Sequence, residues 1–336
     1  MRQTNCWLKL KWDRLLKKII LFTVAFISLF LVGFLIGQTK QPDLQTVRRS
    51  QIAMGTIVEI QVRGLETEPA NIAITAAFQE IYRNVLLLDE IKFEKKELKK
   101  QDTTEIDRLL TACDNYWHLS SGALDCALGS LINVWGFHTD QPSVPSSKDL
   151  ELALAKSGWG AIEQQADGSW IINQDVSFDF GAIAKGAIVD QAINTLQQHG
   201  VNNGLVNAGG DIRVLGDDWI AGIQHPRIQN SIIEQVNLSD MAVATSGDYE
   251  QFFIQDGVRY HHILDPHHGF PVYGIQSVTV LAPTCLEADA LATIVFVLGK
   301  QHGIELIEEL PSIEVLIIDD QGVKIPSSGF LAFTQE

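Results

Sequence analysis

The segment AVATSGDYEQFFIQDGVRYHHILDPHHGFP, Ala242–Pro271, defines the clearest local fold in the chain. Val243–Thr245 and Phe252–Gln255 are rich in residues that favour β-strands. Asp256-Gly257 between strands is typical of a tight hairpin turn, because both of its residues readily take positive φ. The sequence therefore predicts a strand, a hairpin turn and a return strand over residues 258–264.

Short polar side chains crowd this same segment. His262 and Asp265 lie near the end of the expected return strand, and Ser246 and Asp248 lie on a nearby turn. Two interpretations are open. These residues form a functional site, or the two aspartates cap turns and the histidines lie on the surface.

Strands and helices alternate along the rest of the chain, which is 336 residues long, 46% hydrophobic and 20% charged. That composition is typical of a globular protein with a sizeable core, and the length allows one large domain or two ordinary ones. Strands are predicted over 52–62, 204–211, 219–226 and 277–281, a hairpin at 167–168, and helices after Pro69 and over 104–120, 147–158, 182–199 and 284–299.

One predicted helix start has the chemistry of an anion site. Asp179 is expected at a strand end, Gly181 permits a turn, and Lys185 lies in the first turn of a helix that starts near Ala182. Unpaired backbone N–H groups at such a turn attract phosphate. The pattern matches neither the P-loop nor the dinucleotide fingerprint, so alone it also fits an ordinary helix start.

A second helix carries two oxygen ligands on one face. Asp289 and Thr293 are four residues apart within a mostly apolar helix. A carboxylate and a hydroxyl stacked in this way suit a hard cation such as Mg²⁺. A buried aspartate also requires a partner, which argues against two incidental polar residues.

The N-terminus is expected to be a membrane anchor. Residues 1–18 contain six basic residues and one acidic residue, a net charge of +5, and residues 19–37 contain no charged residue. Nineteen uncharged residues are about the length of a transmembrane helix, whereas a secretory signal has a shorter apolar core. The charge pattern predicts a cytoplasmic segment 1–18, a single span 19–37, a linker 38–50 and a domain 51–336 outside the cytoplasm.

The net charge limits the classes of binding partner, and the cysteine content allows a disulfide. The net charge of the whole chain is −16, so the residues after the N-terminal segment carry −21. A nucleic-acid-binding domain is expected to be basic, so the charge disfavours this class and predicts no nucleic-acid partner. Cys113 and Cys126 are either bridged, which an oxidising compartment permits, or buried free thiols.

Eight segments in order resemble the motifs of the ApbE-type FAD:protein FMN transferases, over about residues 50–335. They are MGT at 54–56, GALD with LGSLINVWGF at 122–137, DFGAIAKGAIVD at 179–190, VNAGGDI at 206–212, GIQHPR at 222–227, AVATSGDY at 242–249, HILDP with a following Gly and Pro at 262–271, and APTC with ADALAT at 282–293.

The resemblance implies an α/β domain, with a mixed sheet and packed helices, that cleaves FAD and transfers its FMN half. The acceptor is a Thr or Ser hydroxyl of a protein subunit of a membrane redox complex, the link is a phosphoester, and AMP leaves. The resemblance also implies Mg²⁺ and a location on the outer face of the cytoplasmic (inner) membrane, on its periplasmic side.

Site residues follow from the matching motifs. Residues implied to contact FAD are Met54, Ala123, Leu124, Asp125, Asp179, Lys185, His262 and Ile263. The carbonyl of Ala182 and the side chains of Asp289 and Thr293 are implied to hold Mg²⁺.

The chemistry of transfer assigns the catalytic pair. An acceptor hydroxyl needs a proton acceptor, and histidine titrates nearest neutral pH, so His262 is the expected general base, with Asp265 orienting it. A histidine that only packs against the flavin satisfies the same motif.

Three departures from the family pattern stand out. Residues 92–110 are shorter and more basic than the family's Ser/Asn-rich segment, Leu124-Asp125-Cys126 replaces Phe-Asp-Pro, and His268 stands where a threonine is common. Two other functions stay open. One is hydrolysis of FAD to FMN and AMP, and the other is an inactive membrane-anchored FAD-binding protein.

Overall fold

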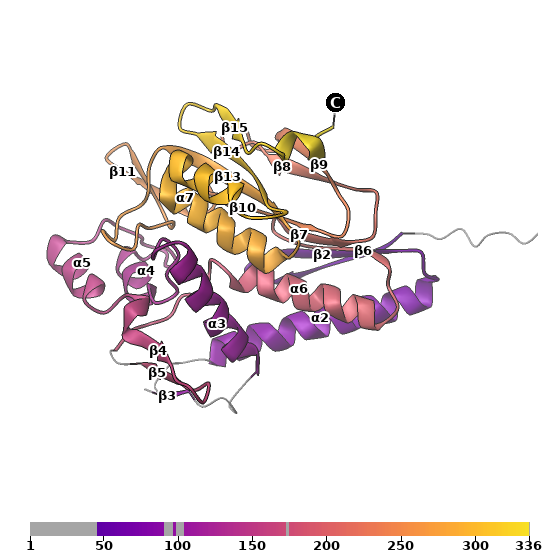
Figure 1. Ribbon diagram of the computed structural model, residues 1–336, viewed down its shortest axis with the longest axis horizontal. Helices are drawn as coiled ribbons and strands as arrows, with labels where there is room; N and C mark the ends of the chain where they lie inside the picture. The colour runs from indigo at the N-terminus through magenta and orange to yellow at the C-terminus, as the bar shows by residue number, and fades with distance from the viewer. Residues whose placement is uncertain (1–45, 91–96, 99–103, 173–174, 336) are drawn as a thin grey trace, which may run out of the picture. The chain divides into compact units, whose positions relative to one another are not determined.

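A computed structural model describes residues 46–90, 97–98, 104–172 and 175–335 (Figure 1). The predicted cytoplasmic segment 1–18 and membrane anchor 19–37 lie outside these residues, and so do most of the charged residues between 91 and 103. Residues 46–336 form one compact unit.

An eight-stranded sheet forms the centre of this unit, in the order β1-β2-β6-β7-β10-β13-β14-β15. Its strands are β1 (Val47–Ala53), β2 (Thr56–Arg63), β6 (Asn203–Ala208), β7 (Asp211–Leu215), β10 (Ala242–Gly247), β13 (Ile275–Ala282), β14 (Glu314–Asp319) and β15 (Lys324–Pro326). The expected sheet with packed helices is confirmed, but the expected mixed pairing is wrong, because every neighbouring pair is antiparallel. Tight turns such as Gly209-Gly210, between β6 and β7, join sheet neighbours and force the chain to reverse.

The first hairpin corrects two predicted boundaries. β1 begins at Val47, so residues 47–50 belong to the sheet and not to a linker, and the strand predicted over 52–62 is broken at Met54-Gly55. Met54 has φ 53° and Gly55 has φ 70°, the two positive values that a two-residue turn requires. The alternation of apolar residues continues across the turn, so the sequence pattern predicts a single strand.

Helices cover one face of the sheet, and a smaller β-layer covers the other (Figure 1). The helices are α2 (Thr67–Glu90), α6 (Ala184–Gln198) and α7 (Cys285–Glu308). The opposite layer contains β8 (Trp219–Gln224), β9 (Ile232–Leu238) and η2 (Phe330–Phe333). All eight residues of β13 are buried, as expected for a strand covered on both faces.

α7 passes the length and hydropathy test for a membrane span, and it alone does so within the described part of the chain. A core helix of the same length and hydropathy passes this test too, and the buried residues of α7 pack in the main core of the domain. Gly299, with φ 80°, interrupts the helix. Thr284 caps its start by accepting a hydrogen bond from the Glu287 N–H, as predicted.

A third group of elements lies at one end of the sheet (Figure 1). It contains α3 (Thr104–Leu119), α4 (Gly129–Trp135), α5 (Ser147–Leu154), η1 (Trp159–Ala161), and a small sheet of β3 (Glu97–Leu98), β5 (Trp170–Ile172) and β4 (Ile162–Gln164). The cap of α5 is Ser146, one residue earlier than predicted. α4 lies within the GALD–LGSLINVWGF motif, for which no helix was predicted.

The two interpretations of Cys113 and Cys126 are resolved as a disulfide. The bond ties α3 to the loop that follows Asp125, across a sequence separation of 13 residues. Cys285 is free and buried. The disulfide therefore restrains the loop that carries the predicted flavin-contact segment 123–125.

Removal of this disulfide should destabilise the domain. A loop of this length predicts that replacing both Cys113 and Cys126 with Ala lowers the free energy of unfolding by about 3 kcal/mol. Urea denaturation of the variant and of the wild type measures this difference. Addition of dithiothreitol should lower the wild-type midpoint and leave the variant unchanged, and equal midpoints without reductant would contradict the prediction.

Candidate active site

A cavity of about 290 Å³ brings together eleven of the twelve predicted site residues. They are Met54, Ala123, Leu124, Asp125, Asp179, Ala182, Lys185, His262, Ile263, Asp289 and Thr293. These residues come from the β1–β2 turn, the loop after α3, the start of α6, the segment after β12 (Val258–His261) and α7. Asp265 is not among the lining residues.

Asp289 is a buried carboxylate that lines the cavity, 5% exposed. Its Oδ2 accepts a hydrogen bond of 2.9 Å from the backbone N–H of Gly186, in the first turn of α6. One turn further along α7, the Thr293 hydroxyl lies 3.2 Å from that of Ser246. Burial and the nearby charge of Asp211 raise the pKa of Asp289 well above its usual value. The ionised form of Asp289 is therefore not fully compensated by the positive charges around it.

This donor set fits a hard cation. No group of three or more His, Cys, Asp and Glu that could hold a metal is found among the residues described here. A cation in this cavity would instead be held by the Asp289 carboxylate, the Thr293 hydroxyl and the Ala182 carbonyl, which are the oxygen ligands that Mg²⁺ prefers.

Gly186 is required for this arrangement. A Cβ at this position would lie 2.4 Å from the carbonyl oxygen of Cys285, so only glycine allows α6 to approach the start of α7 closely enough to reach Asp289. We expect Gly186→Ala to lower the free energy of unfolding by roughly 1–3 kcal/mol. Thermal unfolding measures the loss. Gly160→Ala is the matched control, because its Cβ would meet no atom within 4 Å, and equal losses would contradict the prediction.

Lys185 is the cation of the cavity. Its Nζ lies 2.7 Å from Oδ2 of Asp211, a side chain on β7 that is almost fully buried. Burial opposes the lysine charge, but the attraction of Asp211, Asp289 and Glu250 raises the pKa of Lys185 above its usual value. Lys185 is therefore protonated at neutral pH and held where it can neutralise a bound phosphate.

Glu250 is a lining residue that sequence reasoning missed. Burial in the cavity raises the pKa of Glu250 to about 7, although Lys185 acts in the opposite direction. Glu250 directly follows the AVATSGDY motif, and this position in the sequence is the signal that could have identified it.

The loop before α6 holds Asp179. The structure places Asp179 in an irregular stretch and not at a strand end as predicted, because residues 175–180 pair with no strand. Its Oδ1 accepts the N–H of Gly181 at 2.7 Å, and its Oδ2 lies 3.9 Å from Nε2 of His138. Although burial acts in the opposite direction, these two groups hold the pKa of Asp179 below its usual value. His138 also lines the cavity and was missed.

Asp125 organises the loop beside the disulfide. Its two carboxylate oxygens accept the backbone N–H groups of Ala127 at 2.7 Å and Trp159 at 2.8 Å. Asp125 therefore fixes the segment with Ala123 and Leu124 that lines the cavity. Met54 also lines the cavity, from a turn whose positive φ is uncommon for a methionine.

His262 comes directly after β12, which ends at His261, so the predicted return strand is shorter than expected. Its Nδ1 lies 3.3 Å from the carbonyl oxygen of Gln251. A carbonyl can only accept, so Nδ1 carries the proton in this contact and Nε2 is left as a proton acceptor. Burial, followed by the charge of His261, lowers the pKa of His262 to about 4, which keeps the ring neutral at pH 7.

Asp265 has a different place from the one predicted. Its carboxylate accepts the N–H of His267 at 2.7 Å and its carbonyl accepts the N–H of Gly269 at 2.7 Å, so Asp265 caps a turn. The interpretation that it orients His262 finds no contact among the described residues. His268 is exposed in the same turn and is not a lining residue.

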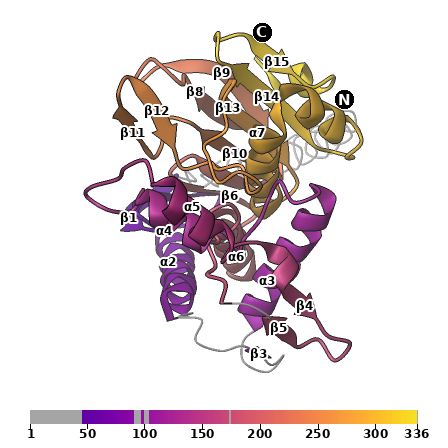
Figure 2. The same cartoon turned by 90° about the vertical axis from the view of Figure 1, so that its left-hand side faces the viewer.

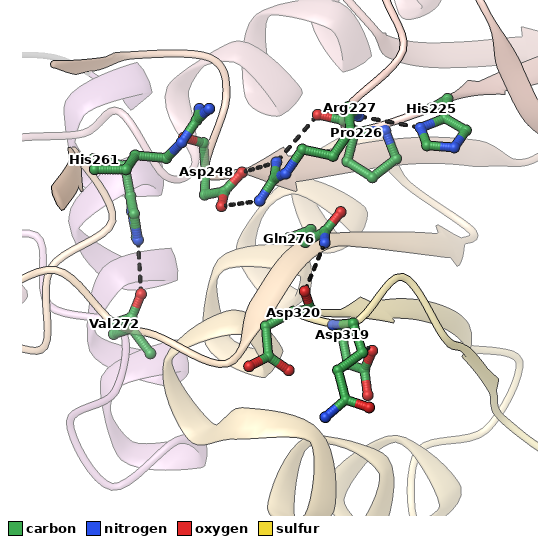
Figure 3. A network of polar contacts seen from close by, with 11 residues as sticks. His225, Pro226, Arg227, Asp248, His261, Val272, Gln276, Asp319 and Asp320 are labelled. Carbon is green, nitrogen blue, oxygen red and sulfur yellow. Dashed lines mark hydrogen bonds and ion pairs between the residues drawn. The ribbon is translucent and has the colours of Figure 1, made fainter. Parts of the chain in front are cut away.

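Arg227 and Asp248 fix the turn that leads into this segment (Figure 3). Two guanidinium nitrogens of Arg227 each donate to one oxygen of Asp248 at 2.6 Å. Asp248 is buried, at 7% exposure, so the interpretation that it only caps a surface turn is wrong. The pair joins two of the motifs quoted above and holds the turn between β10 and β11 (Phe252–Gln255), which carries Glu250 and Gln251 into the cavity.

A larger hollow of about 480 Å³ lies elsewhere, beside α2, α3 and α6. None of the predicted site residues lines it. Its aspartate, Asp190, is already bonded by Arg213 and by the backbone N–H groups of Cys285 and Leu286. The smaller cavity is therefore the candidate active site.

Comparisons with known proteins identify the class. Residues 54–317 match the model of the ApbE family. A FAD:protein FMN transferase of Vibrio cholerae is 38% identical over 229 residues, which are 64% of this chain and 68% of that protein. One of Treponema pallidum is 35% identical over 221 residues, 59% of this chain and 61% of that protein.

Solved structures agree with these matches. The crystal structure of the ApbE protein of Thermotoga maritima has a TM-score of 0.78 and 31% identity, and covers 87% of this chain and 100% of that one. The flavin transferase ApbE of Vibrio cholerae has a TM-score of 0.74 and 30% identity, over 86% and 99%. The protein is thus an enzyme of the transferase class. It belongs to the ApbE family.

Proposed function

We propose that this protein transfers the FMN half of FAD to a Thr or Ser hydroxyl of another protein, in a reaction that depends on Mg²⁺. The observation that carries the proposal is the cavity itself, which Lys185, the Asp289–Thr293 pair and a neutral His262 all line. The activity for which the relatives are named, FAD:protein FMN transfer, supports the choice of FAD and of a protein acceptor.

The reaction replaces the phosphoanhydride bond of FAD with a phosphoester bond to the acceptor. The acceptor hydroxyl oxygen attacks the phosphorus of the FMN half, the bridging P–O bond breaks, and AMP leaves with the bonding electron pair. The hydroxyl proton passes to Nε2 of His262, the ring nitrogen that its contact with Gln251 leaves unprotonated. Lys185 compensates the negative charge of the diphosphate.

Mg²⁺ would be held by Asp289, Thr293 and the Ala182 carbonyl, and would supply further neutralisation of the diphosphate when bound. The fold buries the Asp289 carboxylate and fixes it with a hydrogen bond from the Gly186 N–H. A buried carboxylate with a raised pKa gains most from a cation, because the cation removes the cost of its desolvation.

We also propose that residues 19–37 anchor the enzyme in the cytoplasmic membrane, with the domain from residue 51 on the periplasmic side. The uncharged run and the preceding +5 segment support this topology. The acceptor would then be an exported, flavin-carrying subunit of a membrane redox complex, and nucleic acid would not be a partner.

A transfer assay tests the function. The soluble part, residues 41–336, is mixed with FAD, Mg²⁺ and a Thr-containing acceptor domain and run on a denaturing gel. We expect a fluorescent acceptor band that survives denaturation, with one AMP released per flavin attached. Accumulation of free FMN and AMP without a band would instead assign the hydrolase, and tight FAD binding without turnover would assign an inactive binding protein.

A further inference from the structure

The hairpin of β11 and β12 has β11 on its outer side (Figure 2), and the residues at its base line the candidate active site. The two strands pair only with each other within the described residues. The Gln251 carbonyl accepts the His262 N–H at 3.1 Å, so this residue pair is a hydrogen-bonded one. Hydrogen-bonded and non-hydrogen-bonded pairs alternate in an antiparallel ladder, so the backbone N–H and C=O groups of Phe252 and Ile254 point away from β12.

The hairpin is held rigidly from its inner face. Phe253 and Tyr260 stack on one another and pack against Trp135 of α4, with ring centroids 6.3 Å and 5.6 Å from that tryptophan. The Trp135 Nε1–H in turn donates to the carbonyl of Gly269 at 2.7 Å. The open edge is therefore fixed in place relative to the segment that carries His262.

The outer face of β11 has the character of a binding edge. Phe252 is 40% exposed and Ile254 is 63% exposed. Proteins protect open strand edges with lysine, proline or bulges. The sequence Phe252–Gln255 contains none of these, and its register with β12 is uninterrupted.

The edge leads directly into the cavity. Gln251, the residue before β11, and His262, the residue after β12, both line it. The base of the hairpin is anchored by the Arg227–Asp248 pair and by the contact of His261 Nε2 with the Val272 carbonyl at 2.6 Å (Figure 3). A chain that runs along β11 therefore ends beside Gln251, at the cavity that His262 also lines.

We propose that the acceptor protein presents its Thr or Ser in an extended segment that pairs with β11 as a third strand. This proposal rests on the function proposed above. Backbone pairing supplies affinity with little dependence on acceptor sequence, and the exposed side chains of Phe252 and Ile254 contact alternate residues of the segment. The end of this added strand places its hydroxyl beside His262.

Ile254→Pro is the decisive variant. Proline removes the outward N–H of residue 254, and it leaves the β11–β12 ladder intact, because that N–H takes no part in it. We expect the acceptor KM of the full chain in detergent to rise about tenfold, while the Kd for FAD stays unchanged. Ile254→Val, which keeps the N–H of residue 254, is the matched control, and its acceptor KM should equal that of the wild type.

A peptide competitor provides the second measurement. A twelve-residue copy of the labelled segment of the acceptor domain is prepared unmodified and with N-methyl groups on its odd or on its even residues. Strand pairing directs alternate backbone groups to the partner, so one methylated series should lose inhibition and the other should retain it.

The outcomes separate the proposal from the function it rests on. Absence of covalent flavin with wild-type enzyme refutes both. Flavin transfer with an unchanged acceptor KM for Ile254→Pro, or equal inhibition by both methylated series, overturns the edge pairing alone. A concentration-dependent dimer that Ile254→Pro dissociates assigns the edge to a second copy of the chain instead.

Discussion

Asp289→Asn should abolish metal-dependent turnover without unfolding the enzyme. The variant keeps the size of the side chain and an oxygen for the Gly186 N–H, but it removes the charge that would hold Mg²⁺. Loss of a metal ligand removes several kcal/mol of charge stabilisation, so we expect kcat for flavin transfer to fall by more than about 100-fold. Quantitative in-gel fluorescence of the labelled acceptor measures it.

The same variant should lose activity but not stability. The folded-state pKa of Asp289 is raised, so above its ordinary pKa of 3.8 the folded protein binds the proton more tightly than the unfolded chain does. Stability from this group is present at low pH and declines as pH rises toward the raised pKa. At pH 7 in EDTA, Asp289→Asn should therefore unfold at the same temperature as the wild type or above it.

Addition of Mg²⁺ and a control variant at a second buried aspartate complete this experiment. Addition of Mg²⁺ should raise the unfolding temperature of the wild type and leave that of Asp289→Asn unchanged. Asp319 is an equally buried aspartate on β14, whose Oδ1 accepts the N–H groups of Gln321 and Val323. Asp319→Asn should lower the unfolding temperature but retain turnover per folded molecule. Wild-type turnover in Asp289→Asn would remove this residue from the metal position.

The site was predictable because its residues sit in short local motifs with distinct chemistry. Asp289 and Thr293 are on one helical face, and their polarity in an apolar helix marked them before any contact was known. Lys185 was marked by a glycine turn. The motif order then grouped segments as distant as Met54 and Thr293, which no local pattern relates, and the structure places both at one cavity.

The errors arose where a contact that the sequence pattern does not mark decides the role of a residue. Asp248 and Asp265 look alike as short acids at turns, but Arg227 pairs with the first and a backbone turn engages the second. Glu250 and His138 line the cavity only because of how their loops are folded. Sheet pairing was misjudged for the same reason, because the strand order depends on turns such as that at Met54.

His262→Ala should lower flavin transfer by about 10²–10⁴-fold, the range typical of a lost general base. The Kd for FAD should change by less than about threefold, since the variant removes a proton acceptor and not a charge. Rescue by added imidazole separates this role from packing against the flavin, because imidazole restores a base but not a fixed ring. A large rise in the Kd for FAD, without rescue, would assign His262 to flavin packing.

The pH dependence sharpens the assignment of His262. Its pKa is lowered to about 4 by burial, so the ring is neutral and able to accept a proton throughout the neutral range. Turnover limited by His262 should therefore be level from about pH 6 to 8 and fall only toward pH 4. The unfolded chain binds the His262 proton more tightly, so folding stability from this group is gained as pH rises from about 4 to 6.5. An inflection near pH 7 that disappears in Glu250→Gln would instead place the proton acceptor on Glu250, whose pKa is about 7.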